Sequence, residues 1–164
     1  MAPDKADQIS CMIAGVHKCG TTTLRDQLAE HPAFATHAEM EMTFFSSLKS
    51  EFEDSGDSML ARYFPDVPPG TSLLAKHAAA CCDEEELARL AAHSPDCRVI
   101  LSIRDPVERA HSAYLMESAR GSRQLPFAEL VGEMLEGEPG DEDWRERIYL
   151  RLSLIHISEP TRPY

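Results

Sequence analysis

The sequence predicts an α/β fold in which a parallel β-sheet is flanked by helices. Two segments, residues 9–32 and 98–121, carry this prediction, because each has a short apolar run followed by a turn and then a helical repeat. Strands that alternate with helices in this order pair side by side in one parallel sheet. With 164 residues, the chain has the length of one domain with its own core.

The first of these segments predicts a loop that binds an anion. An apolar strand is expected at residues 9–14, and a helix is expected from Thr22 until Pro32. Gly15 and Gly20 bound the turn between them, so the backbone can curl with its N–H groups pointing inward. The loop also precedes a helix N-terminus, whose partial positive charge favours an anion.

The loop carries polar side chains that suit a phosphate-like group. Lys18 supplies a full positive charge, and Thr21, Thr22 and Thr23 supply hydroxyl donors. The nucleotide-triphosphate P-loop has the same glycine spacing, but its lysine directly follows the second glycine and precedes Ser or Thr. Here Thr21 takes that place and the lysine lies inside the loop, so the pair that orients Mg²⁺ is absent.

The middle of the chain predicts a further strand and a capped helix. A buried strand is expected at Leu73 and Leu74, ending near Lys76, and Asp83 is expected to cap a helix over residues 84–93. The segment 98–103 is the clearest strand, because its nearly continuous apolar run is typical of a parallel strand covered on both faces. Residues 33–49 are expected to form a loop, and a short helix is expected around residues 59–64.

The second strand-to-helix junction has strong signals for a helix start. Asp105 is expected at the N-cap and Pro106 at the first helical position, with Glu108 completing a capping box. The helix should run to about Arg120, with Gly121 just beyond its end. Two more helices are expected, near residues 127–135 and from residue 143 onward.

Arg104 is expected at the carboxyl end of its strand, and Ser112 follows eight residues later, about two helical turns away. In an open α/β sheet, ligands bind at the carboxyl ends of the strands. Both residues are therefore candidates for ligand binding.

The two junctions together resemble the sulfotransferases that use 3′-phosphoadenosine 5′-phosphosulfate (PAPS), especially the carbohydrate and heparan-sulfate type. Residues 15–24 resemble the family's 5′-phosphosulfate loop, and residues 103–114 resemble its 3′-phosphate motif. The resemblance implies a sulfotransferase fold of the P-loop type and the following cofactor-binding residues: Lys18, Gly20, Thr21, Thr22, Thr23, Arg104 and Ser112.

The resemblance also implies a general base. Residues 39–45 are similar to the family segment Lys-Glu-x-x-Phe-Phe, in which Glu41 takes the place of the glutamate and Met40 that of the lysine. Glu39 is an alternative base. Lys76 matches another family lysine only weakly, because the residues after it depart from the Thr/Ser-Pro-x-Tyr pattern.

The implied reaction transfers a sulfuryl group from PAPS to a hydroxyl or amine of an acceptor, for which we expect a carbohydrate. The catalytic residues implied are Lys18, which neutralises charge on the leaving phosphate, and Glu41, which accepts the proton of the acceptor. No metal is expected, and the five cysteines have no metal-ligand spacing.

Charge and composition narrow the partners. The net charge of -12 argues against general nucleic-acid binding, which needs a basic surface. No apolar run in the sequence approaches the length of a membrane-spanning helix. Many members of the family are Golgi proteins with an upstream membrane anchor, so the resemblance leaves the compartment open between the Golgi and the cytoplasm.

The resemblance covers residues 9–152, which we expect to be the N-terminal portion of a sulfotransferase domain truncated at its C-terminus. Residues 153–164 have no helical or strand period, and we expect them to form an unstructured, non-native tail. Two alternatives stay open: a P-loop small-molecule kinase, and a non-catalytic anion-binding fragment of the same fold. The sequence does not indicate the acceptor, the oligomeric state or the activity of this chain alone.

Overall fold

The computed structural model describes residues 8–46, 62–121 and 125–136. They belong to two compact units, Met1–Ile103 and Arg104–Tyr164. In the described part of the chain, no helix combines the length and the apolar character that crossing a membrane requires. The helix expected from residue 143, the tail at 153–164 and most of the short helix around residue 60 lie outside the described residues.

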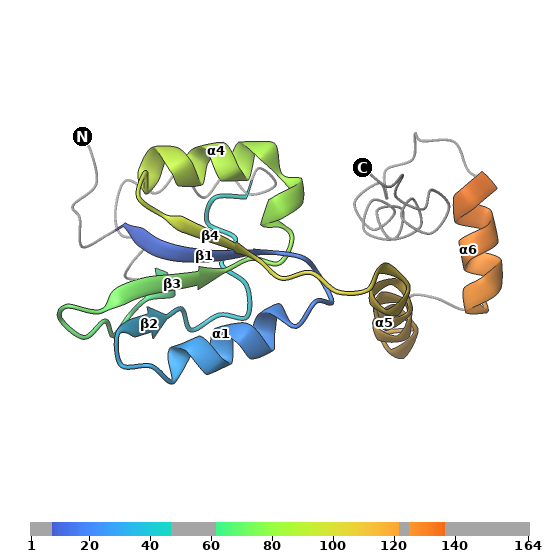
Figure 1. Cartoon of the computed structure of the whole chain (residues 1–164), viewed down its shortest axis with the longest axis horizontal. Helices are drawn as coiled ribbons and strands as arrows, with labels where there is room; N and C mark the ends of the chain where they lie inside the picture. The colour runs from blue at the N-terminus through green and yellow to red at the C-terminus, as the bar shows by residue number, and fades with distance from the viewer. Residues whose placement is uncertain (1–7, 47–61, 122–124, 137–164) are drawn as a thin grey trace, which may run out of the picture. The chain divides into compact units, whose positions relative to one another are not determined.

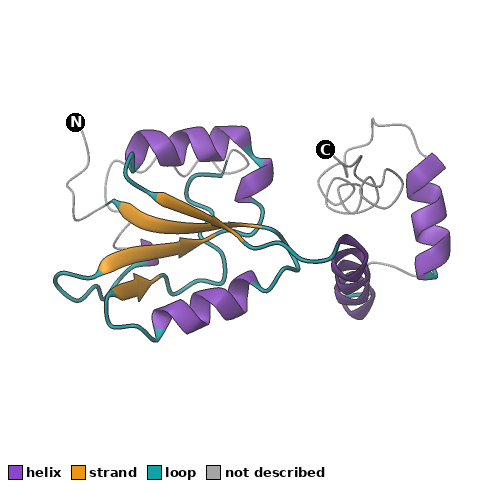
Figure 2. Cartoon of the chain, in the orientation of Figure 1, coloured by secondary structure: helices purple, strands orange, loops and turns teal. Residues whose placement is uncertain are grey.

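The first unit is built on a four-stranded parallel sheet with the strand order β2-β3-β1-β4 (Figure 2). Its strands are β1 (Ile9–Gly15), β2 (Phe34–Thr36), β3 (Ser72–Lys76) and β4 (Arg98–Leu101). The central strand β1 is apolar along most of its length, as a strand with neighbours on both sides requires. The predicted parallel α/β sheet is therefore confirmed.

Two helices cover opposite faces of this sheet (Figure 1). Helix α1 (Thr21–Ala29) follows β1, and helix α4 (Glu84–His93) follows β3 after the short 3₁₀ turn η2 (Ala80–Cys82). The expected cap of α4 is confirmed, because the carboxylate of Asp83 accepts a hydrogen bond of 3.1 Å from the backbone N–H of Glu86.

Each face of the sheet has its own core. On the face of α1, Cys11, Ile13 and Leu74 are buried against the two leucines of the helix. The other face has the larger core, whose fully buried members come from the strands and from the connecting segments: Ile9, Met12, Ala14, Met42, Phe45, Tyr63, Leu73, Ala75 and Ala80. This larger core holds the segment with Met42 against the sheet near the carboxyl ends of its strands.

Three expectations about the first unit are corrected. Strand β4 is an edge strand, and its Val99 and Leu101 side chains are 50% and 55% exposed, so the expected cover on both faces is wrong for this strand. It also ends at Leu101, two residues earlier than predicted. The expected loop after α1 contains β2, whose three residues pair with β3.

The second unit contains helices α5 (Pro106–Ala119) and α6 (Phe127–Glu136), both as predicted. Asp105 caps α5 by accepting hydrogen bonds of 3.0 Å from the N–H groups of Val107 and Glu108. The expected capping box is only half formed, because the Glu108 carboxylate pairs with the guanidinium of Arg104 instead of returning to the cap residue. Gly121 has a φ of 78° just after the helix, as expected for this position.

Candidate functional site

Three residues with positive φ shape the backbone of the loop between β1 and α1. Gly15 has a φ of 148°, Lys18 of 68° and Gly20 of 78°. Gly20 occupies the N-cap of α1 and has no side chain with which to cap it. The N–H groups in the first turn of a helix have no acceptor within the helix, so the first turn at residues 21–23 presents donors toward the loop. Such an arrangement suits an anion.

The segment after β4 holds this loop in place. The N–H of Val16 donates to the carbonyl of Ser102 at 3.0 Å, and the N–H of Ser102 donates to the carbonyl of Gly15 at 2.8 Å. The Ser102 hydroxyl donates to the carbonyl of Cys19 at 2.6 Å, and the Cys19 N–H donates to the Val16 carbonyl at 3.1 Å. Two N–H groups of the loop are therefore used within the protein, and the helix end provides the remaining donors.

Lys76 is the central side chain of the site. It ends β3 and is 0% exposed, and its ammonium lies 2.6 Å from Oε1 of Glu41 and 3.2 Å from the hydroxyl of Thr22. The other carboxylate oxygen of Glu41 accepts a hydrogen bond of 3.0 Å from the backbone N–H of Ala78. Two predicted site residues, Thr22 and Glu41, are thus joined through a lysine that the sequence indicated only weakly.

The backbone of Lys76 anchors the segment that carries Glu41. Its N–H donates to Nε2 of the buried His37 at 3.0 Å, and its carbonyl accepts from the N–H of Met42 at 2.8 Å. Since the backbone N–H is the donor, Nε2 of His37 is the unprotonated nitrogen. Burial, followed by the positive charge of Arg25, lowers the pKa of His37 to about 4, so this histidine is neutral at pH 7.

The two candidate bases differ in their surroundings. Glu41 is partly buried and is held through both oxygens, whereas the carboxylate of Glu39 lies 3.8 Å from Arg62 with both side chains about half exposed. Arg25 of α1 holds the backbone between them, because its Nη1 donates to the carbonyls of Glu39 and Met40 at 3.3 and 3.4 Å. The Met40 side chain, which replaces the family lysine, is 72% exposed.

A hydrogen-bonded pair of His77 and Glu86 lies at the end of β3 toward α4. Nδ1 of His77 lies 2.7 and 2.9 Å from the two oxygens of Glu86, and Glu86 is fully buried. The backbone N–H of His77 donates to the carbonyl of Ile13 at 3.0 Å, which joins the ends of β3 and β1. The pair fastens α4 to the carboxyl end of the sheet.

The remaining predicted residues belong to the second unit. Arg104 is about half exposed, and its guanidinium lies 2.9 Å from the carboxylate of Glu108 on the first turn of α5. Ser112 is partly buried in the middle of the same helix. Thus Lys18, Glu41 and the threonines of α1 belong to one unit, and Arg104 and Ser112 belong to the other.

Sequence reasoning missed the roles of two residues. Lys76 was a weak candidate and His37 was none, although both are buried at the centre of the Glu41 environment. The position of Lys76 directly after the apolar residues 73–75 was a signal that this lysine has a buried partner, because an unpaired ammonium is not tolerated at the end of a buried strand. No comparable signal marked His37.

The arrangement places a helix end that suits an anion next to a lysine and a carboxylate. A helix N-terminus with a lysine in the preceding loop can bind a phosphate or a sulfate, and a carboxylate can accept a proton from a hydroxyl or an amine. The ammonium of Lys76 contacts both parts, since it donates to Thr22 in the first turn of α1 and to Glu41. These are the components that transfer of an anionic group to a nucleophile needs.

Comparisons with known proteins identify the fold. No family model matches the sequence, and no curated protein matches it. A crystal structure of a sulfotransferase from Alicyclobacillus acidocaldarius does match, with a TM-score of 0.71 and 21% sequence identity, over 92% of this chain and 67% of that one. The chain therefore has the fold of this sulfotransferase.

Proposed function

We propose that this chain is part of a PAPS-dependent sulfotransferase that transfers a sulfuryl group to a hydroxyl or amine of a carbohydrate acceptor. The observation that carries the proposal is the contact of Lys76 with both Glu41 and Thr22 at the carboxyl end of the sheet. It joins a candidate base to the helix end that suits an anion, within a fold shared with a known sulfotransferase.

The loop between β1 and α1 is the proposed site of the 5′-phosphosulfate. The glycine N-cap leaves the first-turn N–H groups without a capping side chain, and Thr21, Thr22 and Thr23 add hydroxyl donors in the same turn. Lys18 would stabilise the negative charge that develops on the leaving phosphate oxygen as the bond from sulfur to that oxygen breaks. Resemblance to the family motif supports Arg104 and Ser112 as ligands of the 3′-phosphate.

Glu41 is the proposed general base. It would accept the proton of the acceptor hydroxyl or amine while the acceptor atom forms the new bond to sulfur and 3′,5′-adenosine bisphosphate leaves. Its contacts with Lys76 and Ala78 hold the carboxylate in one orientation, and each carboxylate oxygen keeps a further lone pair for the proton. Glu39 has no such restraint on its side chain, because its neighbour Arg62 is itself half exposed.

Calorimetric titration with 3′,5′-adenosine bisphosphate in EDTA, compared with ATP and Mg²⁺, tests the cofactor class. We expect the bisphosphate to bind without metal, because the loop lacks the lysine and hydroxyl pair that orients Mg²⁺ in P-loop kinases. Preferential binding of ATP with Mg²⁺ would instead support a kinase. Binding without turnover, in the presence of PAPS and varied acceptors, would support a non-catalytic anion-binding module.

Two variants separate the proposed roles. Arg104→Ala should weaken bisphosphate binding on the order of 10- to 100-fold, as expected for the loss of hydrogen bonds to a charged group. Arg120→Ala is the matched control, because Arg120 is exposed and pairs with Glu117 on the same helix. Lys18→Ala should abolish release of the bisphosphate from PAPS in the presence of acceptors. Equal and small effects of the Lys18 and Arg104 substitutions would contradict the assignment.

The base is tested by the rate of transfer at saturating PAPS. Glu41→Gln should lower the rate by roughly 10²- to 10⁴-fold, and Glu39→Gln should leave it nearly unchanged. Circular dichroism of each variant shows whether equal amounts of folded protein are compared. A larger loss from Glu39→Gln than from Glu41→Gln would move the role of base to Glu39.

A further inference from the structure

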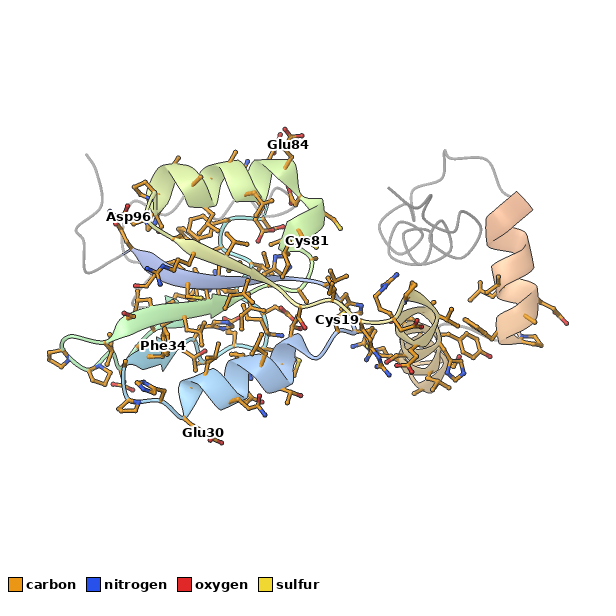
Figure 3. All side chains as sticks on the ribbon, in the orientation of Figure 1. Cys19, Glu30, Phe34, Cys81, Glu84 and Asp96 are labelled. Atoms are coloured by element: carbon orange, nitrogen blue, oxygen red, sulfur yellow. The ribbon has the colours of Figure 1, made fainter. Side chains whose placement is uncertain are left out.

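Two neighbouring cysteines lie next to Gly15, the first residue of the proposed anion-binding loop. Cys81 and Cys82 belong to the 3₁₀ turn η2, and Figure 3 shows Cys81 between the sheet and the start of α4. A Cβ added to Gly15 would lie 2.6 Å from Sγ of Cys81, so this sulfur packs directly against the glycine. The proposed sulfuryl transfer uses neither thiol.

The sulfurs are separated by the distance that a shared soft ligand requires. Sγ of Cys81 lies 3.7 Å from Sγ of Cys82, and both residues are partly exposed thiols. Two thiolates bound at about 2.3 Å to one soft centre lie about 3.5–3.8 Å apart when the angle between the two bonds is about 100–109°. The pair can therefore bind such a centre with almost no movement of either sulfur.

A disulfide between the same residues is much less favourable. The Cα atoms of neighbouring residues are about 3.8 Å apart, whereas unstrained disulfides need Cα atoms at least about 4.4 Å apart. The sulfurs would also have to approach from 3.7 Å to about 2 Å. When one atom bridges the two sulfurs, the ring that they close is larger, so neither the wider Cα separation nor the close approach of the sulfurs is needed. The geometry therefore favours chelation by both thiols over formation of a disulfide.

A hydrogen bond also joins the two thiols. This hydrogen bond to Cys82, followed by burial, raises the pKa of Cys81, so Cys81 is a protonated thiol at neutral pH. A ligand that binds both sulfurs displaces the two thiol protons. Among the described residues, no group of three or more histidine, cysteine or acidic side chains could hold a metal ion, so a ligand that needs only two thiolates suits the pair.

We propose that Cys81 and Cys82 form a binding site for a thiophilic centre that takes two thiolates, such as a monosubstituted trivalent arsenical. In the reaction, two bonds from arsenic to sulfur form and the bond from arsenic to oxygen breaks. Both thiol protons leave with that oxygen as water. Arsenic stays trivalent, so no oxidant or reductant takes part.

Phenylarsine oxide is the probe, and intact-mass spectrometry of the full chain is the first measurement. We expect one adduct per chain, and mapping of alkylated peptides should show Cys81 and Cys82 protected together. A dithiol such as 2,3-dimercaptopropanol should remove the adduct, whereas 2-mercaptoethanol should not, because two bonds on one chain act as a chelate. Protection of any other pair of cysteines would overturn the proposal.

Cysteine variants provide the second test. Cys81→Ser and Cys82→Ser should each weaken binding by about 10²- to 10⁴-fold, since either change removes the chelate. Cys97→Ser is the matched control, because Cys97 is also partly buried and its thiol contacts the carbonyl of Arg98. Loss of the adduct in Cys97→Ser, or its retention in Cys81→Ser or Cys82→Ser, would overturn the proposal.

Discussion

The ion pair of Lys76 and Glu41 predicts an unequal response to the removal of each partner. Glu41→Gln leaves the ammonium of Lys76 in a fully buried position without an opposite charge. Lys76→Met leaves the carboxylate of Glu41 without its ammonium partner, but the Glu41 side chain is 34% exposed and reaches water. The loss of the glutamate charge should therefore destabilise the protein more than the loss of the lysine.

The magnitudes follow from the distance and the burial. At 2.6 Å and an effective dielectric constant of about 20, the attraction is about 6 kcal/mol, most of which offsets the loss of hydration. Removing one partner of a buried pair costs about 3–5 kcal/mol, which we expect for Glu41→Gln. Lys76→Met should cost about 1–2 kcal/mol, because water compensates part of the remaining charge.

Urea unfolding followed by circular dichroism measures these differences. With a slope of about 2 kcal/mol per molar urea, Glu41→Gln should lower the midpoint by about 1.5–2.5 M. The double variant, which has no buried charge at this position, should be more stable than Glu41→Gln alone. Glu39→Gln is the matched control and should change the free energy of unfolding by less than about 1 kcal/mol, because its ion pair is exposed.

Two results would refute this reasoning. Equal midpoints for Glu41→Gln and Glu39→Gln would show that the contact of 2.6 Å does not stabilise the folded state. A double variant less stable than both single variants would show that the buried ammonium does not depend on the carboxylate.

Two further predictions concern neighbouring residues. His37 takes up a proton below pH 6.5 in the unfolded state but only near pH 4 in the folded state. The free energy of unfolding should therefore fall by about 3 kcal/mol as the pH is lowered from 6.5 to 4. In urea unfolding measured at several pH values, His37→Gln should remove this part of the pH dependence, and an unchanged pH dependence would contradict the prediction. Gly15→Ala should lower the melting temperature more than Gly20→Ala, because both have positive φ but only Gly15 meets a sulfur at 2.6 Å. Equal losses would show that this contact relaxes freely.

The sequence predicted most of the fold because its signals are local. Asp83 and Asp105 marked two helix starts, and the apolar runs at 9–14 and 98–103 marked two parallel strands, the second of which ends at Leu101. Strand β2 was missed because its three residues have no alternation of their own and form a strand by pairing with β3. The exposure of β4 was missed because apolarity does not show which strand lies at an edge.

The site was predicted less completely, because its contacts join residues far apart in the chain. Lys76 reaches Glu41, 35 residues earlier, and Thr22, 54 residues earlier. Neither contact follows from spacing or composition. Glu108 shows that even a contact between near neighbours in the chain can be predicted wrongly. Its carboxylate was expected to accept from the backbone N–H of Asp105 in a capping box, but it pairs with Arg104 instead.

The backbone of Lys76 also constrains the number of residues in the segment that carries Glu41. Its N–H contacts His37 and its carbonyl contacts Met42, so both ends of residues 37–42 are attached to one residue of β3. A segment tied at both ends tolerates changes in its exposed side chains, as at Met40, but an insertion or deletion would carry Glu41 away from the lysine. In related sequences, this stretch should therefore vary in composition while its number of residues stays constant.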